Sequence, residues 1–222
     1  LVKPFADERI ALTYGRQTGD SRTKFAEQQL MRRWFPAMSV ARQDHPFCNN
    51  ANAVIRNDIW AAQPYDEELT GLEDIEWARG AIEKGYLLAY VAESAVVHVH
   101  EESWDRLRNR YRREAIAHRR IYEKQRLSAL EAFLLSLRHV ANDYWVAAEQ
   151  GVLLRNLLSI PSFHSAQFLG AYQGFAQDGE IPQHLKRRFY YPARAADACG
   201  LDTPPIGRPI DYTAPGCHDA NL

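Results

Sequence analysis

The sequence predicts an α/β fold followed by a C-terminal helical extension. Short strand candidates alternate with helices over residues 1–102, residues 103–179 are strongly helical, and residues 180–222 are rich in Pro and Gly with little periodicity. We therefore expect an α/β domain, a helical extension and an irregular tail or linker in these three ranges. Hydrophobic residues make up 46% of the 222, so the chain can bury a sizeable core.

The elements of the α/β part follow from apolar periodicity and from residues that end helices. Strands are expected where aromatic and β-branched residues are enriched, and helices where apolar residues recur every three or four positions. Pro36 ends the first helix, because the residue before a proline disfavours the helical conformation. The expected elements are strands at Ile10–Tyr14, Ala53–Ile55, Tyr86–Val91 and Ala95–Val99, helices at Lys24–Trp34 and Leu72–Lys84, and a helical turn at Asp58–Ala62.

The helix at Leu72–Lys84 carries the clearest end signals. Thr70 and Glu73 fit a capping box at its start, and Gly85 stands where a left-handed residue caps the end. Glu73 and Asp74 fall in the first turn, where the helix dipole favours ionised carboxylates. The local pattern alone is therefore explained by a solvated helix start.

The helical extension begins with a basic amphipathic helix. Ser103 caps it, and an apolar stripe that includes Trp104 and Tyr111 lies opposite a face rich in arginine. Such a helix can lie on an anionic membrane, meet nucleic acid, or be a solvated face whose arginines pair with nearby acids. Two further helices are expected, one starting with a capping box at Ser128 and Glu131 and one at Ser165–Ala176.

Bulk composition excludes several classes of protein. The net charge of −1 gives no reason to expect a nucleic-acid partner, and no apolar run approaches the length of a membrane span. We expect no signal peptide, because no cationic start precedes an apolar run. The three cysteines, Cys48, Cys199 and Cys217, show no C-x-x-C spacing, which indicates a reducing compartment and no zinc site.

Three stretches then combine into a family resemblance. They are PFCNNANAVIRNDIW at 46–60, PYDEELTGLEDIEW at 64–77 and GYLLAYVAESAVVHVH at 85–100. Together they resemble the second half of a family 2 glycosyltransferase catalytic domain of the bacterial surface-polysaccharide type, which has the nucleotide-sugar transferase fold called GT-A. The resemblance covers about residues 1–125, and it implies a partial GT-A fold followed by the helical extension.

The chain departs from the family at one point. The first half of the family's domain binds the nucleotide and carries a D-x-D motif for the metal, and no D-x-D occurs in this sequence. By resemblance, roughly a hundred residues with a Rossmann-like fold should precede Leu1. We therefore expect that the isolated chain can be inactive without that half.

The resemblance implies roles for acidic and histidine residues. Asp74 matches the general base that takes the proton of the acceptor hydroxyl, and Glu73 orients the loop or binds the acceptor. His98 matches the histidine that helps bind a divalent metal, Mn or Mg, on the leaving diphosphate, and His100 is a lesser candidate on the same strand face. Without the family, His98 reads as an ordinary histidine near a strand end.

Four more residues are expected to bind substrate. By resemblance, Asn50 and Asn52 border the donor sugar and the acceptor, although asparagine is also common in turns. Arg56 stands at the end of the adjoining strand. Trp77 could stack on a sugar ring, although a tryptophan on a helix face is more often part of a core.

These observations predict an inverting glycosyltransferase. It would move a hexosyl or deoxyhexosyl group from a nucleotide-sugar donor to a polysaccharide or lipid-linked acceptor in bacterial polysaccharide biosynthesis. The expected location is cytoplasmic, with a possible peripheral contact at the inner face of the membrane. The alternative is a non-catalytic helical module that binds a membrane or another protein through the extension.

Overall fold

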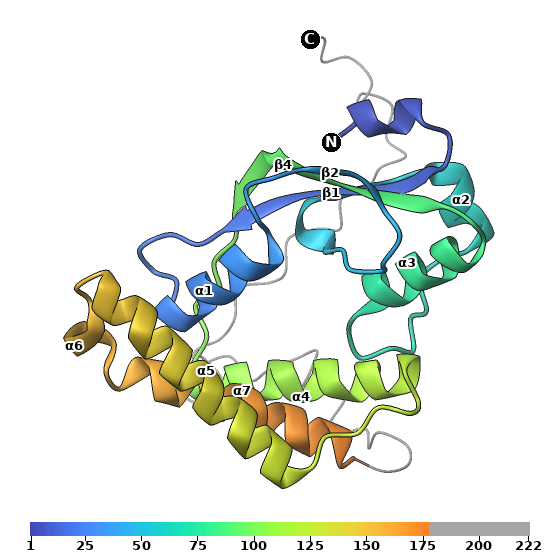
Figure 1. The fold of residues 1–222 in the computed structure, drawn as a ribbon. Coiled ribbons are helices and arrows are strands. Elements are labelled where there is room, and N and C mark those ends of the chain that lie inside the picture. Colours follow the sequence, from blue (N-terminus) through green and yellow to red (C-terminus); the bar gives the residue numbers. More distant parts are fainter. Residues whose placement is uncertain (178–222) are drawn as a thin grey trace, which may run out of the picture.

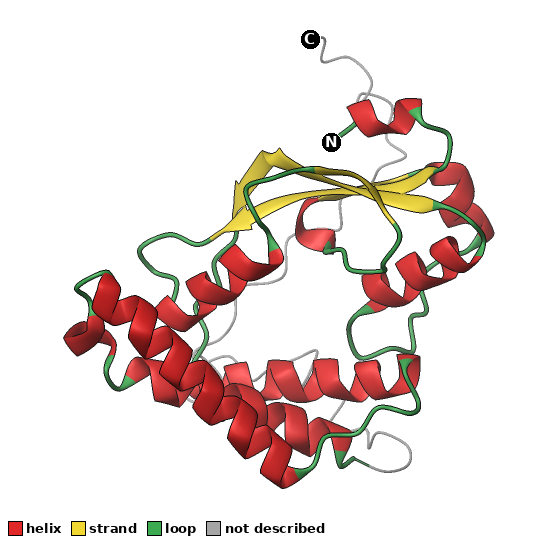
Figure 2. Cartoon of the chain, in the orientation of Figure 1, coloured by secondary structure: helices red, strands yellow, loops and turns green. Residues whose placement is uncertain are grey.

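The computed structural model describes residues 1–177, which form a mixed α/β protein with a four-stranded sheet. The strands are β1 (Ile10–Thr18), β2 (Val40–Gln43), β3 (Ala53–Ile55) and β4 (Leu87–Val97), and their order in the sheet is β2-β4-β1-β3. The two long central strands β1 and β4 are parallel, whereas β3 pairs antiparallel with β1 and β2 antiparallel with β4 (Figures 1 and 2).

The observed strands extend and merge the predicted ones. β1 continues from Tyr14 to Thr18, and the two strands expected at 86–91 and 95–99 form the single strand β4. A register shift between Gly15 and Arg16 of β1 accommodates the polar residues of β4 between the two predicted segments. β2 was not predicted, because its sequence VARQ is short and lies on an edge, where apolar alternation is weak.

Seven α-helices and two 3₁₀ turns complete the described part of the chain. Ser103 caps α4, and Ser128 and Glu131 form a full capping box at the start of α5, so both predictions are confirmed. The elements are η1 (Lys3–Ala6), α1 (Phe25–Trp34), η2 (Asn50–Asn52), α2 (Asn57–Ala62), α3 (Glu73–Glu83), α4 (Trp104–Ile121), α5 (Ala129–Glu149), α6 (Leu153–Asn156) and α7 (Ser159–Phe175).

The capping box predicted at Thr70 is wrong. The N-cap of α3 is Leu72, which has a left-handed backbone (φ 59°) and makes no side-chain cap. The hydroxyl of Thr70 instead donates to the backbone oxygen of Arg113 in α4 at 2.9 Å. The Thr70 hydroxyl therefore bonds a distant helix and does not form the predicted capping box with Glu73.

The main core lies between the sheet and the helices α1 and α3. Met31 of α1 and Trp77 of α3 are buried against Leu12, Tyr14 and other residues of the central strands. Burying apolar area of this kind is the main force that holds α1 and α3 on the sheet. Figure 1 shows both helices on the same side of the sheet, facing the layer of α4, α5 and α7.

The helical extension forms a second layer. Leu107 and Tyr111 of α4 are buried with Phe163 of α7 and with Leu30 of α1. At Leu107 and Tyr111 the apolar stripe of α4 is therefore covered by α7 and α1, whereas Trp104 stays 41% exposed. Contact of this helix with an anionic membrane stays a prediction. Within residues 1–177, no helix is both long enough and apolar enough to cross a bilayer. The irregular tail expected at 180–222 lies outside the described residues.

Helices α4 and α7 approach each other through two glycines. A Cβ atom added at Gly170 would lie 2.2 Å from the backbone oxygen of Arg108, and one added at Gly174 would lie 2.4 Å from that of Arg112. Real Cβ atoms do not come this close to a backbone oxygen, so the two backbones could not keep this spacing with larger residues. The pair therefore fixes the distance between α4 and α7.

We expect Gly170→Ala to destabilise the protein, although helix propensity alone predicts a gain of about 1 kcal/mol. Overpacking against the α4 backbone costs about 1–3 kcal/mol, so the free energy of unfolding should fall. Urea denaturation measures this change. Ser165→Ala, on an exposed position of the same helix, is the control and should not destabilise. A more stable Gly170→Ala protein would show that the glycines do not set the helix spacing.

Candidate active site

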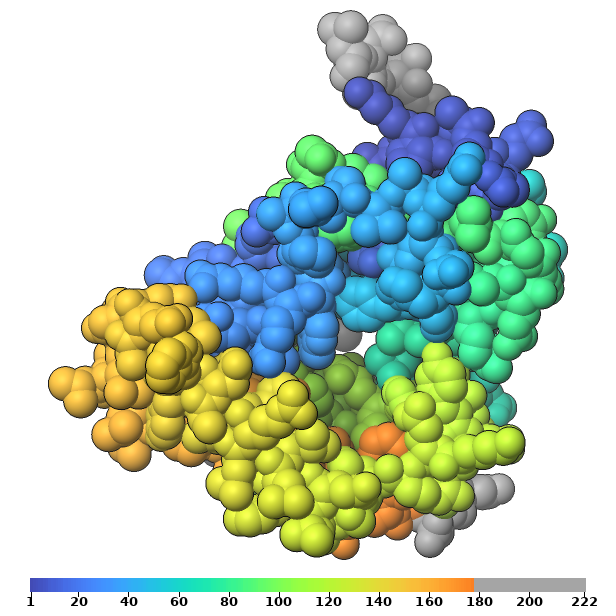
Figure 3. Space-filling model, in the orientation of Figure 1, coloured from blue at the N-terminus to red at the C-terminus, as the bar shows by residue number. Residues whose placement is uncertain are grey.

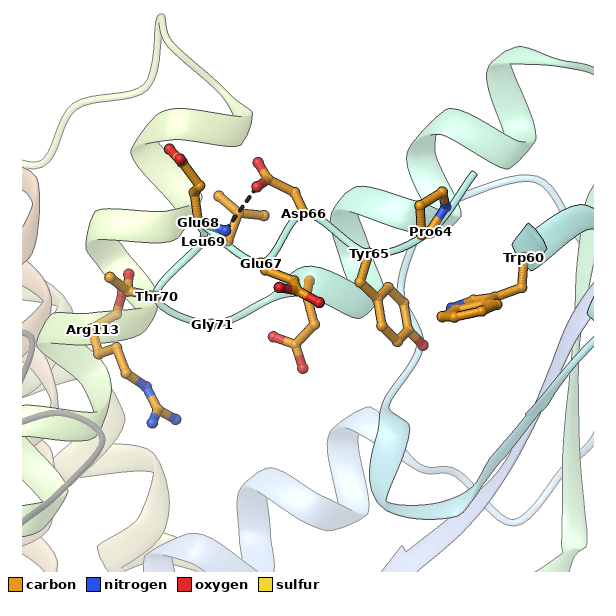
Figure 4. A pocket seen from close by; sticks show the side chains of 11 residues that line it. Trp60, Pro64, Tyr65, Asp66, Glu67, Glu68, Leu69, Thr70, Gly71 and Arg113 are labelled. Atoms are coloured by element: carbon orange, nitrogen blue, oxygen red, sulfur yellow. Dashed lines mark hydrogen bonds between the residues drawn. The ribbon is translucent and has the colours of Figure 1, made fainter. Parts of the chain in front are cut away.

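A cavity of about 610 Å³ opens at the loop that leads into α3. Trp60 and Tyr65 stand at one end of it, and Thr70 and Arg113 at the other (Figure 4). Glu73 also lines the cavity, as do Asp66, Glu67 and Glu68 of the same loop. The face seen in Figure 3 is hollowed between the sheet layer and the layer of α4 and α5. The cavity therefore draws its walls from the α/β part and, through Arg113, from the helical extension.

Asp74 directly follows Glu73 in the chain, does not itself line the cavity, and is held by backbone hydrogen bonds. One carboxylate oxygen accepts the N–H of Asn50 at 3.0 Å, and the other accepts that of Ile75 at 2.9 Å. The side chain of Cys48 donates to the backbone oxygen of Asp74 at 3.3 Å. Only 8% of Asp74 is exposed. These bonds join the loop before β3 to the first turn of α3 and fix the direction of the carboxylate.

The environment of Asp74 raises its pKa to about 6. The main cause is burial, which disfavours the charged form, and the second is the neighbouring charge of Glu73. The backbone N–H groups of Asn50 and Ile75 favour the charged form but offset only part of this. No arginine or lysine is among the causes. The carboxylate is therefore ionised above about pH 6 and readily takes up a proton, as a general base must.

Of the two predicted site acids, Glu73 is the one that lines the cavity. Its Oε1 accepts the side-chain amide of Asn50 at 3.2 Å, and the Asn50 amide oxygen accepts the hydroxyl of Tyr65 at 2.8 Å. Asn50 thus binds both acids, Asp74 through its backbone and Glu73 through its side chain. Asn50 therefore joins the two acids at the site, and its predicted contact with the donor sugar or acceptor stays a prediction. Tyr65 was not predicted, although its place in PYDEE, within the resemblance, could have indicated it.

Asn52 belongs to the same loop as Asn50, but its side-chain amide makes a hydrogen bond that holds the loop on the sheet. The amide nitrogen donates to the backbone oxygen of Ser94 in β4 at 2.7 Å. Gly15 makes room for it, because a Cβ there would lie 2.2 Å from the same nitrogen. Asn49 has a similar role, since its side-chain oxygen accepts the N–H of Ala51 at 3.0 Å and the amide of Gln17 at 2.7 Å. These contacts anchor the loop to β1 and β4.

Arg56 and Trp77 do not have the substrate-binding positions that were predicted. The guanidinium of Arg56 donates to the backbone oxygens of Ile10, at 3.2 Å, and Phe5, at 3.1 Å, and it stacks on the ring of Phe5. Trp77 is completely buried, and its indole N–H donates to the backbone oxygen of Gln63. A buried indole has no face free for a sugar. The tryptophan that lines the cavity is Trp60, which is 42% exposed.

His98 and His100 form a hydrogen-bonded chain with Glu27 of α1. The Nε2 atoms of the two histidines are 2.7 Å apart, and Nδ1 of His100 lies 2.9 Å from Oε1 of Glu27. Arg110 of α4 donates to the same oxygen at 2.8 Å. Burial raises the pKa of Glu27, but the bonds from His100 and Arg110 outweigh it and leave the pKa below its usual value.

The ionised carboxylate fixes the hydrogens along this chain. Glu27 can only accept, so Nδ1 of His100 donates to it. When both rings are neutral, Nε2 of His100 accepts a hydrogen from Nε2 of His98, and the lone pair of His98 lies on Nδ1. Burial, together with His100, lowers the pKa of His98, which favours the neutral ring. In this arrangement His100 uses both ring nitrogens in hydrogen bonds, which favours His98 over His100, the lesser candidate, as the metal ligand.

The described residues do not by themselves fit the expected divalent metal. Within residues 1–177, no group of three or more His, Cys, Asp or Glu side chains is arranged to hold a metal ion. In the hydrogen-bonded series of His98, His100 and Glu27, only Nδ1 of His98 keeps a histidine lone pair that could bind a metal ion. One nitrogen is fewer ligands than Mg²⁺ or Mn²⁺ takes in a protein site.

Comparisons with known proteins add no family to these observations. No family model, no curated protein and no solved structure matches the chain. The resemblance to family 2 glycosyltransferases therefore stays a prediction.

The raised pKa of Asp74 predicts how stability changes with pH. Between pH 3.8, which is the ordinary pKa of an aspartate, and about pH 6, Asp74 is protonated in the folded state but ionised in the unfolded state. The stability that comes from neutral Asp74 is present below pH 3.8 and is lost as pH rises through 6. Relative to Asp74→Asn, the wild-type free energy of unfolding should therefore fall by on the order of 2 kcal/mol between pH 4 and 7.

Urea denaturation of both proteins at several pH values in this range measures the difference. Asp58→Asn is a matched control, because it removes an exposed acid from the first turn of α2. Curves for wild type and Asp74→Asn that stay parallel across this range would contradict the raised pKa.

Proposed function

We propose that this chain is the acceptor-side part of an inverting GT-A glycosyltransferase of family 2. It moves a sugar from a nucleotide-sugar donor to a polysaccharide or lipid-linked acceptor. The observation that carries the proposal is Asp74, a backbone-held carboxylate with a pKa of about 6 beside a cavity with aromatic and acidic walls. A carboxyl group whose pKa lies near neutral pH, with no cation to hold it ionised, is suited to proton transfer.

In the proposed reaction, Asp74 takes the proton of an acceptor hydroxyl. The hydroxyl oxygen forms a bond to the anomeric carbon of the donor sugar as the bond from that carbon to the nucleoside diphosphate breaks. The two backbone N–H groups of Asn50 and Ile75 hold the carboxylate in place before the reaction. Because the base is already oriented, little of the barrier is spent on ordering it.

Glu73 is the rival for the role of base, because it lines the cavity and Asp74 does not. We assign Glu73 to the acceptor instead. Its charge raises the pKa of Asp74, and its Oε1 is bonded to the Asn50 amide, which leaves Oε2 to accept from an acceptor hydroxyl. Two adjacent carboxylates with different surroundings can thus divide the two tasks of base and binding group.

The cavity is suited to a saccharide acceptor. Trp60 offers an exposed indole, and Tyr65 stands next to it on the same wall (Figure 4). Aromatic faces pack against the C–H groups of sugar rings, while carboxylates such as Glu73 accept from sugar hydroxyls. A divalent cation stays an expectation of the family resemblance, and no step above depends on it.

The alternative, a non-catalytic helical module that binds through residues 103–176, draws support from α5. The outer face of α5 carries exposed apolar side chains, among them Leu130, Phe133, Leu137 and Trp145. This alternative expects no sugar transfer by the full-length protein with any nucleotide-sugar, so an activity assay separates it from the enzyme.

We expect Asp74→Asn in the full-length protein to reduce sugar transfer by about 100- to 10,000-fold, because the amide cannot take the proton. Release of nucleoside diphosphate from a panel of nucleotide-sugars measures transfer, and calorimetric titration of the donor should show nearly unchanged binding. Glu76→Gln, in the same helix turn, is the control and should retain activity. If Glu73→Gln loses far more activity than Asp74→Asn, Glu73 is the base.

We expect Trp60→Ala to raise the KM for the acceptor by about tenfold with a smaller change in kcat, because a stacking face contributes about 1 kcal/mol or more to sugar binding. Trp34→Ala is the matched control, since Trp34 has a similar exposed fraction and lies outside this cavity. Steady-state kinetics with varied acceptor gives both constants. An unchanged KM for Trp60→Ala would remove Trp60 from the acceptor site.

A further inference from the structure

A second, smaller cavity of about 210 Å³ lies between the end of β1 and the helix α1. Arg16 of β1 and Arg32 of α1 line it, together with the backbone turn at Thr18 and Gly19. Met31 and Phe35 form its apolar side. The cavity is at the carboxyl end of β1, which runs parallel to β4, and ligands of open α/β sheets bind outside such strand ends.

The side chains of Arg16 and Arg32 are not used to hold the fold together, unlike those of Arg110 and Arg56. Arg110 binds Glu27 and Glu102, and Arg56 binds backbone oxygens. The side chains of Arg16 and Arg32 make no ion pair or hydrogen bond within residues 1–177. Arg32 is exposed, whereas Nε of Arg16 is buried without an acceptor. Burying a donor of a charged group without an acceptor costs free energy. Arg16 and Arg32 also bring two positive charges to one cavity, which favours an anion there.

The rim of the cavity is held in place by hydrogen bonds. The side-chain amide of Gln28 donates to the backbone oxygens of Asp20, at 2.8 Å, and Thr23, at 3.2 Å. The N–H of His98 donates to the oxygen of Thr18 at 2.9 Å and closes the end of the sheet. The loop is therefore fixed before any ligand binds, which lowers the entropic cost of binding.

We propose that Arg16 and Arg32 bind a phosphoryl group in this cavity. The planar guanidinium donates two parallel N–H groups to phosphate oxygens, and both arginines are free to do so. The cavity is about a third of the volume of the one at Glu73, so it takes a phosphate or diphosphate and not a whole nucleotide. Gln17, next to Arg16, binds Asn49, which links this site to the loop that holds Asp74.

The site does not depend on the proposed sugar transfer. If that proposal holds, the phosphoryl group comes either from the diphosphate of the nucleotide-sugar or from the phosphate of a lipid-linked acceptor. The arginines would bind either group through the same N–H to phosphate-oxygen hydrogen bonds. Direct binding of small phosphates tests the site whether or not the protein turns over a sugar.

The test is calorimetric titration of pyrophosphate into the full chain at low salt, with a chelator present to exclude metal ions. We expect Arg16→Ala to weaken binding at least tenfold and Arg32→Ala to weaken it by a similar factor. Arg155→Ala, an exposed arginine on α6, should bind as the wild type does. Arg16→Lys keeps the charge but loses the two parallel N–H donors of the guanidinium, so an intermediate affinity is expected. Circular dichroism checks that each variant is folded.

Two results would overturn the proposal. One is no binding of pyrophosphate by the wild-type chain, and the other is an equal loss in Arg155→Ala and Arg16→Ala, which would show only unspecific charge attraction. Methyl phosphate in place of pyrophosphate distinguishes the two sources. Tighter pyrophosphate binding indicates the diphosphate of a donor, and tighter methyl phosphate binding indicates a phosphomonoester.

Discussion

The parallel pairing of β1 and β4 is the constraint on which the arrangement of the site depends. Because the strands run in the same direction, the chain between them must cross from one end of the sheet to the other. This crossover contains α1, the loop at residues 49–52 that binds Asp74, and α3. The carboxyl ends of both strands then meet at one edge, where the backbone of His98 bonds that of Thr18. Arg16 and His98, which are 82 positions apart, are brought to the same end of the sheet.

Two buried carboxylates show how surroundings decide chemistry. Glu27 is buried next to Arg110 and His100, and the pKa of its carboxyl group falls below the usual value. Asp74 is buried beside another acid and no cation, and its pKa rises to about 6. Glu27 therefore stays charged and orders the histidines, whereas Asp74 can exchange a proton near neutral pH. This contrast is why we place the proton transfer at Asp74 and a structural role at Glu27.

Local sequence patterns predicted the elements well where the signal was local. The N-cap at Ser103, the capping box at Ser128, the left-handed Gly85 and the helices α1 and α3 depend on residues within a few positions of one another. The errors arose where a distant partner decided the outcome. Thr70 bonds Arg113 of α4, and Trp77 is covered by the sheet, whereas Trp60 stays exposed. No periodicity distinguishes one tryptophan from the other, because burial depends on the crossover as a whole.

The helical extension supports the site and also forms part of it. Arg110 of α4 holds Glu27, and Arg113 of the same helix forms one end of the cavity beside Glu73. Helix α4 is in turn fixed by the close glycine contacts of α7, and α7 is joined to α5 by the buried pair of His164 and Asp143, 2.8 Å apart. A buried pair of this kind is costly to break, because it would leave one polar group without a partner. The position of Arg113 at the cavity therefore depends on the packing of α4 with α7 and of α7 with α5, although neither α5 nor α7 lines the cavity.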